Sequence, residues 1–459
     1  MSIRPSIIRG SRRIINNDPC FFCLHRSPAG VRSFTIKQRI DPRKGTPGEV
    51  RADIDQRNRR LYFRMLEADK LIPCKLEDAN KIINHFVSNR ASMDPATNAR
   101  KLAQRKEPSQ VATYTFSQYS EYKLKVIHLP MLAIPMFRIP DVNDTTRQLP
   151  PSSNAPLAAS LLVACSAASD LQATLQILNA VYYSAKVHNM PKAAEMARLY
   201  TPKQISDARR MLEQLAEGKD GKSGATGDAN AMTLHGKFLE MAGDTTQARY
   251  FYEKALEHYD TKVWRGYPHP MALPWLTPWT ELVNLEEASP TPSAERMTKA
   301  LKFGALKADD PMAYYKLAIL QDSKSPEWLN YMSKAAASGH PEAMYKLGKF
   351  YHEVQAQPSN FLNNTGFRKA LNFITSWKKN GAADFGMEWL NAAATGGHKP
   401  AVMEMARMYE RTGQEDQVQN CLEVVAAQPP NEIPEEWPDL AAQARHQLTA
   451  LKSSKRALA

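Results

Sequence analysis

The sequence predicts an all-α protein, an irregular solenoid of helix-turn-helix repeats that follows a basic N-terminal extension. Three observations predict this fold class. Beyond about residue 156, apolar positions recur at helical spacing in segments that are separated by short turns. Small residues and aromatics recur at similar places in several of these segments. Apolar residues make up 43% of the 459 residues, enough for a sizeable core, and no stretch is long and apolar enough to predict a membrane-spanning helix.

The positive charge of the chain is concentrated at its N-terminal end. The sequence contains 60 Lys and Arg against 47 Asp and Glu, a net charge of +13. The first 107 residues hold 23 of these basic residues and 11 of the acidic ones, whereas the remainder holds 37 and 36. The predicted repeats are therefore close to neutral, which argues against a basic groove that follows a nucleic-acid backbone. Five cysteines are too few for a disulfide framework.

The segment 1–34 has the composition of a mitochondrial transit peptide. It contains six arginines, no lysine, several serines and one acidic residue, Asp18. Arg32 precedes a predicted cleavage between Phe34 and Thr35. We therefore expect a mitochondrial protein, placed in the matrix or attached to the periphery of the inner membrane. The alternative is a basic N-terminal arm that is not removed.

Residues 35–150 are predicted to form the basic extension. Helices are expected at about 49–71 and 76–87, with a loose polar segment at 91–113. The apolar stretch within 114–150 is bounded by prolines and is predicted to be extended or irregular. The Pro- and Ser-rich run at 150–156 predicts a linker, so the expected domains are 1–34, 35–150 and 151–459.

The first predicted helix of the extension carries candidate contacts for an anionic partner. Basic residues that alternate with aromatic ones suit phosphate neutralisation and base stacking. Nucleic acid and anionic lipid are both candidate partners, and the alternative is that this helix only covers the end of the solenoid. The candidate basic contacts are Arg57, Arg59, Arg60 and Arg64, which lie beside Tyr62 and Phe63.

Two stretches resemble known helical repeats. Small and aromatic residues within 230–259 have the spacing of a tetratricopeptide repeat, where two antiparallel helices pack closely. A stronger resemblance, to the Sel1-like repeat, begins at Trp328-Leu329 and includes Gly339-His340, which recurs 58 residues later as Gly397-His398. The expected repeat-packing residues are Gly236, Ala248, Tyr252, Ala255, Ala343, Leu347, Gly348, Tyr351, Ala401, Ala406 and Tyr409.

The resemblance implies an architecture and says nothing about a ligand. It is clearest over 230–414, and its repeats are unevenly spaced. His340 and His398 occupy matching turns, where they are expected to act as turn and cap residues. The glycine-rich run around 221–223 lacks the remaining elements of a phosphate-binding loop. A loop rich in Trp and Pro, 263–279, is interpreted as a packed loop, with a binding edge as the alternative.

These patterns favour a binding function. No catalytic, cofactor-binding or metal-ligating residues are predicted, and no cofactor is expected. Helical solenoids hold other macromolecules on extended surfaces. We therefore expect a non-enzymatic mitochondrial adaptor for protein partners, an assembly factor or chaperone for a respiratory complex. The alternative is a gene-expression factor that contacts RNA or the ribosome through the basic extension.

Overall fold

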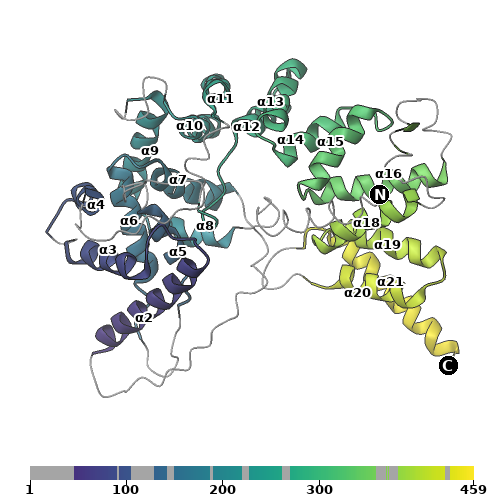
Figure 1. Ribbon diagram of the computed structural model, residues 1–459, viewed down its shortest axis with the longest axis horizontal. Helices are drawn as coiled ribbons and strands as arrows, with labels where there is room; N and C mark the ends of the chain where they lie inside the picture. Colours follow the sequence, from purple (N-terminus) through teal and green to yellow (C-terminus); the bar gives the residue numbers. More distant parts are fainter. Residues whose placement is uncertain are drawn as a thin grey trace, which may run out of the picture. The chain divides into compact units, whose positions relative to one another are not determined.

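The computed structural model describes residues 46–89, 92–104, 129–141, 149–186, 190–219, 227–260, 269–357, 368–369, 371, 381–428 and 435–458. Within these ranges it contains nineteen α-helices and no β-strand, which confirms the predicted all-α fold (Figure 1). Most contacts join helices that follow each other in the chain, as expected for a helical-repeat solenoid. The predicted transit peptide, with Phe34 and Thr35 at its cleavage site, lies outside the described residues.

The chain divides into two compact units after Ser289. We call residues 32–289 the N-terminal unit. Its helices are α2 (Pro47–Ala68), α3 (Leu76–Asn89), α4 (Pro95–Gln104), α5 (Pro130–Met136), α6 (Asn154–Ala167), α7 (Leu171–Lys186), α8 (Pro191–Ala197), α9 (Pro202–Glu217), α10 (Ala229–Met241), α11 (Thr245–His258) and α12 (Pro278–Glu287).

We call the described part of residues 290–459 the C-terminal unit. Its helices are α13 (Ala294–Leu306), α14 (Pro311–Ile319), α15 (Pro326–Ala337), α16 (Pro341–Ala356), α18 (Gly381–Thr395), α19 (Lys399–Arg411), α20 (Glu415–Ala426) and α21 (Pro438–Leu458). They form four antiparallel pairs in chain order, and each pair contacts the next. In the sequence, the residues between α16 and α18 lengthen the step between repeats, which explains their uneven spacing, and α16 and α18 are themselves in contact.

The residues predicted as a linker, 150–156, are bound to α2 instead. Asp55 is 2% exposed and accepts a hydrogen bond from the Ser152 hydroxyl (2.9 Å). It also accepts from the amide (2.6 Å) and the hydroxyl (2.7 Å) of Ser153. These bonds tie α2 to the start of α6, so the division of the chain falls after Ser289 and not at residue 150.

Two arginines on the same face of α2 also point inward. Arg51 is 3% exposed and contacts the carboxylate of Asp55 at 2.9 Å and that of Asp141 at 2.5 Å. Arg59 is 6% exposed and donates to Asn154 Oδ1 at 3.2 Å. Its burial lowers the pKa of the guanidinium, although the nearby Asp55 carboxylate opposes that shift. The basic composition of this helix therefore overstates the charge that it offers to a partner.

Two segments predicted to be irregular are helical. Pro130 begins α5, where a missing backbone N–H costs nothing, and the six residues of α5 other than Met131 are buried. The polar segment predicted to be loose contains α4, whose residue Asn98 donates to the Phe86 carbonyl of α3. Both helices contact α6, so burial against that helix decides their conformation rather than local propensity.

The predicted close approach of helices occurs in both units. A Cβ on Gly236 would lie 2.8 Å from Tyr252 Cε1, and one on Gly348 would lie 3.0 Å from the carbonyl oxygen of Gly386. Only glycine allows the helices to meet at these distances. The repeat-packing residues that are buried are Gly236, Ala248, Tyr252, Ala255, Ala343, Leu347, Gly348, Tyr351, Ala401 and Ala406, and Tyr409 is half-buried.

Candidate protein-binding groove at the end of the repeat array

The second helices of the four C-terminal pairs begin in the same way. Asp310, His340 and Trp437 each precede a proline that opens α14, α16 or α21, and His398 precedes α19 with Pro400 at its second position. Proline is favoured there because its fixed φ suits the first helical turn. Asp310 caps its helix by accepting from Met312 N at 3.0 Å. These residues form a row of helix starts in the C-terminal unit.

His340 confirms the structural role predicted for it. Its Nδ1 accepts a hydrogen bond from the Ala343 amide at 3.1 Å, which caps α16. The imidazole is 4% exposed and stacks on Tyr315 of the preceding pair, with the ring centroids 4.4 Å apart. Burial lowers its pKa to about 4, so the ring is neutral at physiological pH.

His398 links the α15–α16 pair to the α18–α19 pair. Its side chain makes no cap bond to α19, and its Nε2 lies 2.8 Å from the Glu342 carboxylate in the first turn of α16. Its ring centroid is 5.1 Å from that of Tyr345 and 5.4 Å from that of Trp437. His398 therefore bridges α16, α19 and the start of α21.

Three hydrogen bonds hold the backbone around Trp437. Lys399 at the start of α19 donates to the Ala427 carbonyl at 2.7 Å and to Glu435 Oε2 at 2.6 Å. The other carboxylate oxygen of Glu435 accepts from the Trp437 amide at 3.2 Å. The Lys399–Glu435 ion pair and the edge contact with His398 therefore hold the indole of Trp437 in place.

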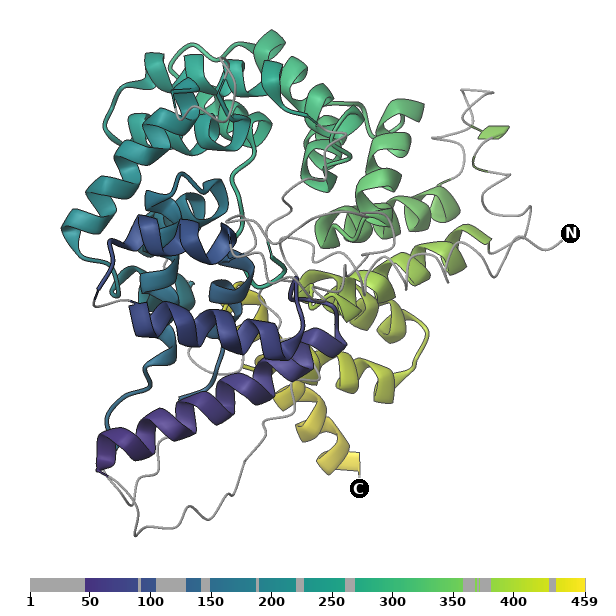
Figure 2. The ribbon, with the colours of Figure 1, turned by 60° about the vertical axis from the view of Figure 1, so that its left-hand side comes forward.

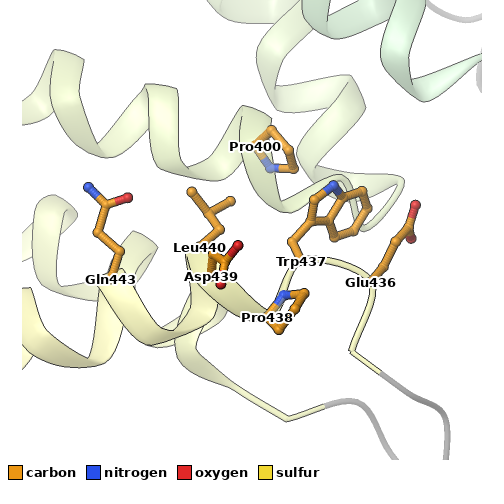
Figure 3. A pocket seen from close by; sticks show the side chains of 7 residues that line it. All are labelled: Pro400, Glu436, Trp437, Pro438, Asp439, Leu440 and Gln443. Atoms are coloured by element: carbon orange, nitrogen blue, oxygen red, sulfur yellow. The ribbon is translucent and has the colours of Figure 1, made fainter.

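Trp437 lies in an open groove of about 390 Å³ at the end of the array. Figure 3 shows Pro400 of α19 and Pro438 of α21 on either side of the Trp437 side chain. The described residues that line this Trp437 groove include two acids and no base. They are Pro400, Glu436, Trp437, Pro438, Asp439, Leu440 and Gln443.

This arrangement suits a peptide segment that is both apolar and basic. The indole, the two prolines and Leu440 offer apolar contact area. A Lys or Arg side chain over the indole would add about 0.5–1 kcal/mol at an exposed site, and the acidic groups would attract it. Tryptophan is also prominent among the residues that dominate binding energy at protein interfaces.

The basic contacts predicted from the sequence lie on α2 in the N-terminal unit. They do not form one exposed surface with the aromatic residues beside them. Arg57, Arg60 and Arg64 are exposed on α2, whereas Arg59 is buried. The aromatics beside them face inward: Phe63 is fully buried and the Tyr62 hydroxyl lies 3.5 Å from Met271 Sδ. No exposed aromatic platform for bases accompanies the arginines on the described helix α2.

The Trp/Pro loop packs on the core over its described part, 269–279. His269 is 2% exposed, its Nδ1 accepts from the Met271 amide, and its Nε2 lies 2.8 Å from the Leu71 carbonyl. The Leu273 amide donates to Gln176 Oε1 at 3.1 Å, and Trp279 is 3% exposed. This part is a packed loop, and 263–268 lie outside the described residues.

Three cysteines have no features of reactive thiols. Burial raises the pKa of Cys74 to about 12, and it also raises the pKa of Cys165 and Cys421. The thiolate form needed for nucleophilic attack is therefore scarce at neutral pH. Over the described ranges, no three His, Cys, Asp or Glu side chains are grouped to hold a metal ion. Nor does any helix there have the length and hydropathy of a membrane span.

The Trp437 groove was not predicted from the sequence. A signal for it exists in the row of helix starts, because Trp437-Pro438 takes the place of His340-Pro341 in the last pair. Comparisons with protein-family models, with curated proteins and with solved structures give no match. The function proposed below therefore rests on the sequence and structure of this chain alone.

Because two histidines are buried, we expect the folded protein to lose stability in mild acid. Burial lowers the pKa of both His269 and His340 to about 4, against 6.5 for an unperturbed imidazole. Between these values the unfolded chain binds protons that the folded chain does not, so the free energy of unfolding falls as pH falls. We expect a loss of about 2 kcal/mol per histidine between pH 7 and pH 5.

Urea unfolding at the two pH values measures this loss. The variant His340→Asn keeps a side chain that can cap α16 but does not titrate, so its C-terminal unit should lose about 2 kcal/mol less than the wild type. An unchanged pH dependence in that variant would show that other groups control the acid response.

Proposed function

We propose that this chain is a non-enzymatic mitochondrial adaptor that binds a protein partner through its helical repeats. Within this proposal it acts as an assembly factor or chaperone for a respiratory complex, and its repeats are of the Sel1-like or tetratricopeptide kind. The observation that carries the binding function is the Trp437 groove, which offers an aromatic, two prolines and acidic groups on a rigid helical support. The Arg-rich segment 1–34 supports the mitochondrial placement.

The composition of the groove favours protein over nucleic acid as the partner. Acidic side chains line it, and an anionic backbone would be repelled by them. Prolines on both sides of an indole give the apolar contact area that peptide-binding surfaces use. The alternative, RNA or ribosome contact through the extension, rests on exposed Arg57, Arg60 and Arg64 alone, because Arg59 and Phe63 are buried.

Site-specific photo-crosslinking in mitochondria tests the proposed function. A photoreactive residue at Gln443, which lines the groove, should capture one or a few proteins in the full chain. The same residue at Tyr250, which is 52% exposed in the N-terminal unit, serves as the control position. Capture from position 443 should fall at least about tenfold when Trp437→Ala is added, the loss expected for a central interface aromatic.

Several results would contradict the proposal. They are crosslinks to RNA instead of protein, equal capture from both positions, and capture that is insensitive to Trp437→Ala. The mitochondrial part has its own test, import of the full chain into isolated mitochondria followed by sequencing of the N-terminus. We expect import that needs the membrane potential and a mature end at Thr35.

A further inference from the structure

The outer side of α2 carries a helix-pairing pattern. The inner side is filled by Arg51, Asp55, Arg59, Phe63 and Leu66, which are all buried against the N-terminal unit. In both views of the chain α2 lies at the outside of that unit (Figures 1 and 2). Over the residues that the structure describes, this outer side is not part of the hydrophobic core of the unit.

Five residues on that side follow a heptad pattern. Their steps are four, three, four and three residues, the spacing of the a and d positions in a coiled coil. Leu61 is 39% exposed and Met65 is 38% exposed, and Ala68 is also exposed, whereas Ile54 and Asn58 are half-buried. We call these residues the α2 seam: Ile54, Asn58, Leu61, Met65 and Ala68.

Arginines border the α2 seam. Arg57 and Arg64 directly precede Asn58 and Met65, which places them at the g positions beside a pairing helix. Both are exposed, and Arg57 is held by an ion pair with Asp53 one turn earlier. On the other border, burial raises the pKa of the Tyr62 hydroxyl, and the charge of Arg138 opposes that rise.

We propose that the α2 seam docks an amphipathic helix of a partner protein with acidic residues at the positions that flank its apolar stripe. Carboxylates there would meet Arg57 and Arg64, since g and e positions form the interhelical ion pairs that select partners. Asn58 at an a position would fix the register of the two helices, as a single polar residue does there. Because α2 is already folded, only the incoming helix has to become ordered.

A second copy of the chain fits the seam poorly. In an antiparallel pair the g positions of the two helices face each other, so Arg57 and Arg64 would meet arginines. In a parallel pair a g position faces the e position of the following heptad, which is the half-buried Tyr62 for Arg57 and Asp69, beyond the end of α2, for Arg64. An acidic helix from a different protein avoids both conflicts.

Anionic lipid and RNA also carry negative charge, but they would contact a different set of arginines from a paired helix. A lipid surface or an RNA backbone attracts every exposed arginine of α2, including Arg60, through general electrostatics. A paired helix distinguishes Arg64 at its g position from Arg60 at a c position, which points away from the seam. This difference gives the proposal its matched control.

The test uses the full chain and two designed peptides. Both have three heptads with Leu at a and d; one carries Glu at e and g, and the other carries Lys there. We expect the Glu peptide alone to bind. Arg64→Glu should weaken that binding at least about fivefold and allow the Lys peptide to bind, whereas Arg60→Glu should change it by less than about twofold. Binding should persist in Trp437→Ala, which separates this surface from the groove.

Four results would overturn the proposal. Two of them are a lack of binding by the Glu peptide and an equal weakening of its binding by Arg60→Glu and Arg64→Glu. Binding of vesicles with 30% phosphatidylserine in place of the peptide would point to a lipid surface. Binding of a single-stranded RNA oligonucleotide in its place would point to nucleic acid. Circular dichroism of both variants should match the wild type, because each changes only an exposed side chain.

Discussion

Replacing Asp55 with alanine is expected to destabilise the N-terminal unit by about 3–5 kcal/mol, the usual cost of removing one partner from a buried ionic group. The carboxylate is 2% exposed and accepts from the Ser152 hydroxyl and from both the amide and hydroxyl of Ser153. It also pairs with Arg51. Alanine would leave buried donors without an acceptor, and each such donor costs about 1–3 kcal/mol.

Asp53→Ala is the matched control, because Asp53 lies two residues earlier on α2 and its side chain is 49% exposed in its ion pair with Arg57. An exposed pair of this kind contributes about 0.5 kcal/mol or less. Urea unfolding gives the free energies, and hydrogen–deuterium exchange of peptides from 47–68 and 149–167 reports the local effect. Similar small losses in both variants would mean that Asp55 does not hold α2 to the start of α6.

The Asp55 contacts explain why the linker prediction differs from the structure. A run of Pro and Ser at 150–156 has no apolar periodicity, so sequence patterns favour a loop there. Its partner lies almost a hundred residues earlier in α2, and no local signal connects the two segments. The burial of Arg59, a candidate basic contact, was not predictable for the same reason, since its partner Asn154 is equally distant in sequence.

Prolines account for another difference. The apolar stretch around Pro130 and Pro135 was predicted to be irregular because proline usually interrupts helices. In α5 the first proline stands at the helix start, and burial of the short helix against α6 stabilises the second. The repeat-packing residues were predictable because Gly348 and its counterparts reflect contacts between neighbouring helices, which leave a local spacing in the sequence.

The sequence predicts the helix starts near the Trp437 groove only in part. His340 was predicted as a cap from the Gly-His-Pro turn, and its bond to the Ala343 amide confirms this. Trp437 occupies the equivalent place without a preceding glycine turn, so the repeat pattern does not predict its role. Trp437 is half-buried at the start of α21, the last helix that the structure describes. Function at the end of a repeat array is thus harder to predict than the packing within it.

Gly348→Val is expected to destabilise the C-terminal unit by about 3 kcal/mol, at the upper end of the cost of overpacking a core. A Cβ at this position would lie 2.8 Å from Leu390 Cγ and 3.0 Å from the Gly386 carbonyl oxygen. The leucine can move, but the carbonyl belongs to the backbone of α18, so the two helices would have to separate. Separation would also disturb the bond between Glu342 and His398, which joins α16 to α19.

Ala356→Val in the exposed last turn of α16 is the matched control, and its cost should stay below about 0.7 kcal/mol, the difference in helix propensity. Adding Leu390→Ala to Gly348→Val separates the two contacts. Removal of the leucine relieves its clash, so the double variant should be more stable than the sum of the single effects predicts, by about 1 kcal/mol. Additive losses would place the whole strain at the Gly386 carbonyl, and a loss no larger than that of Ala356→Val would refute the close approach of α16 and α18.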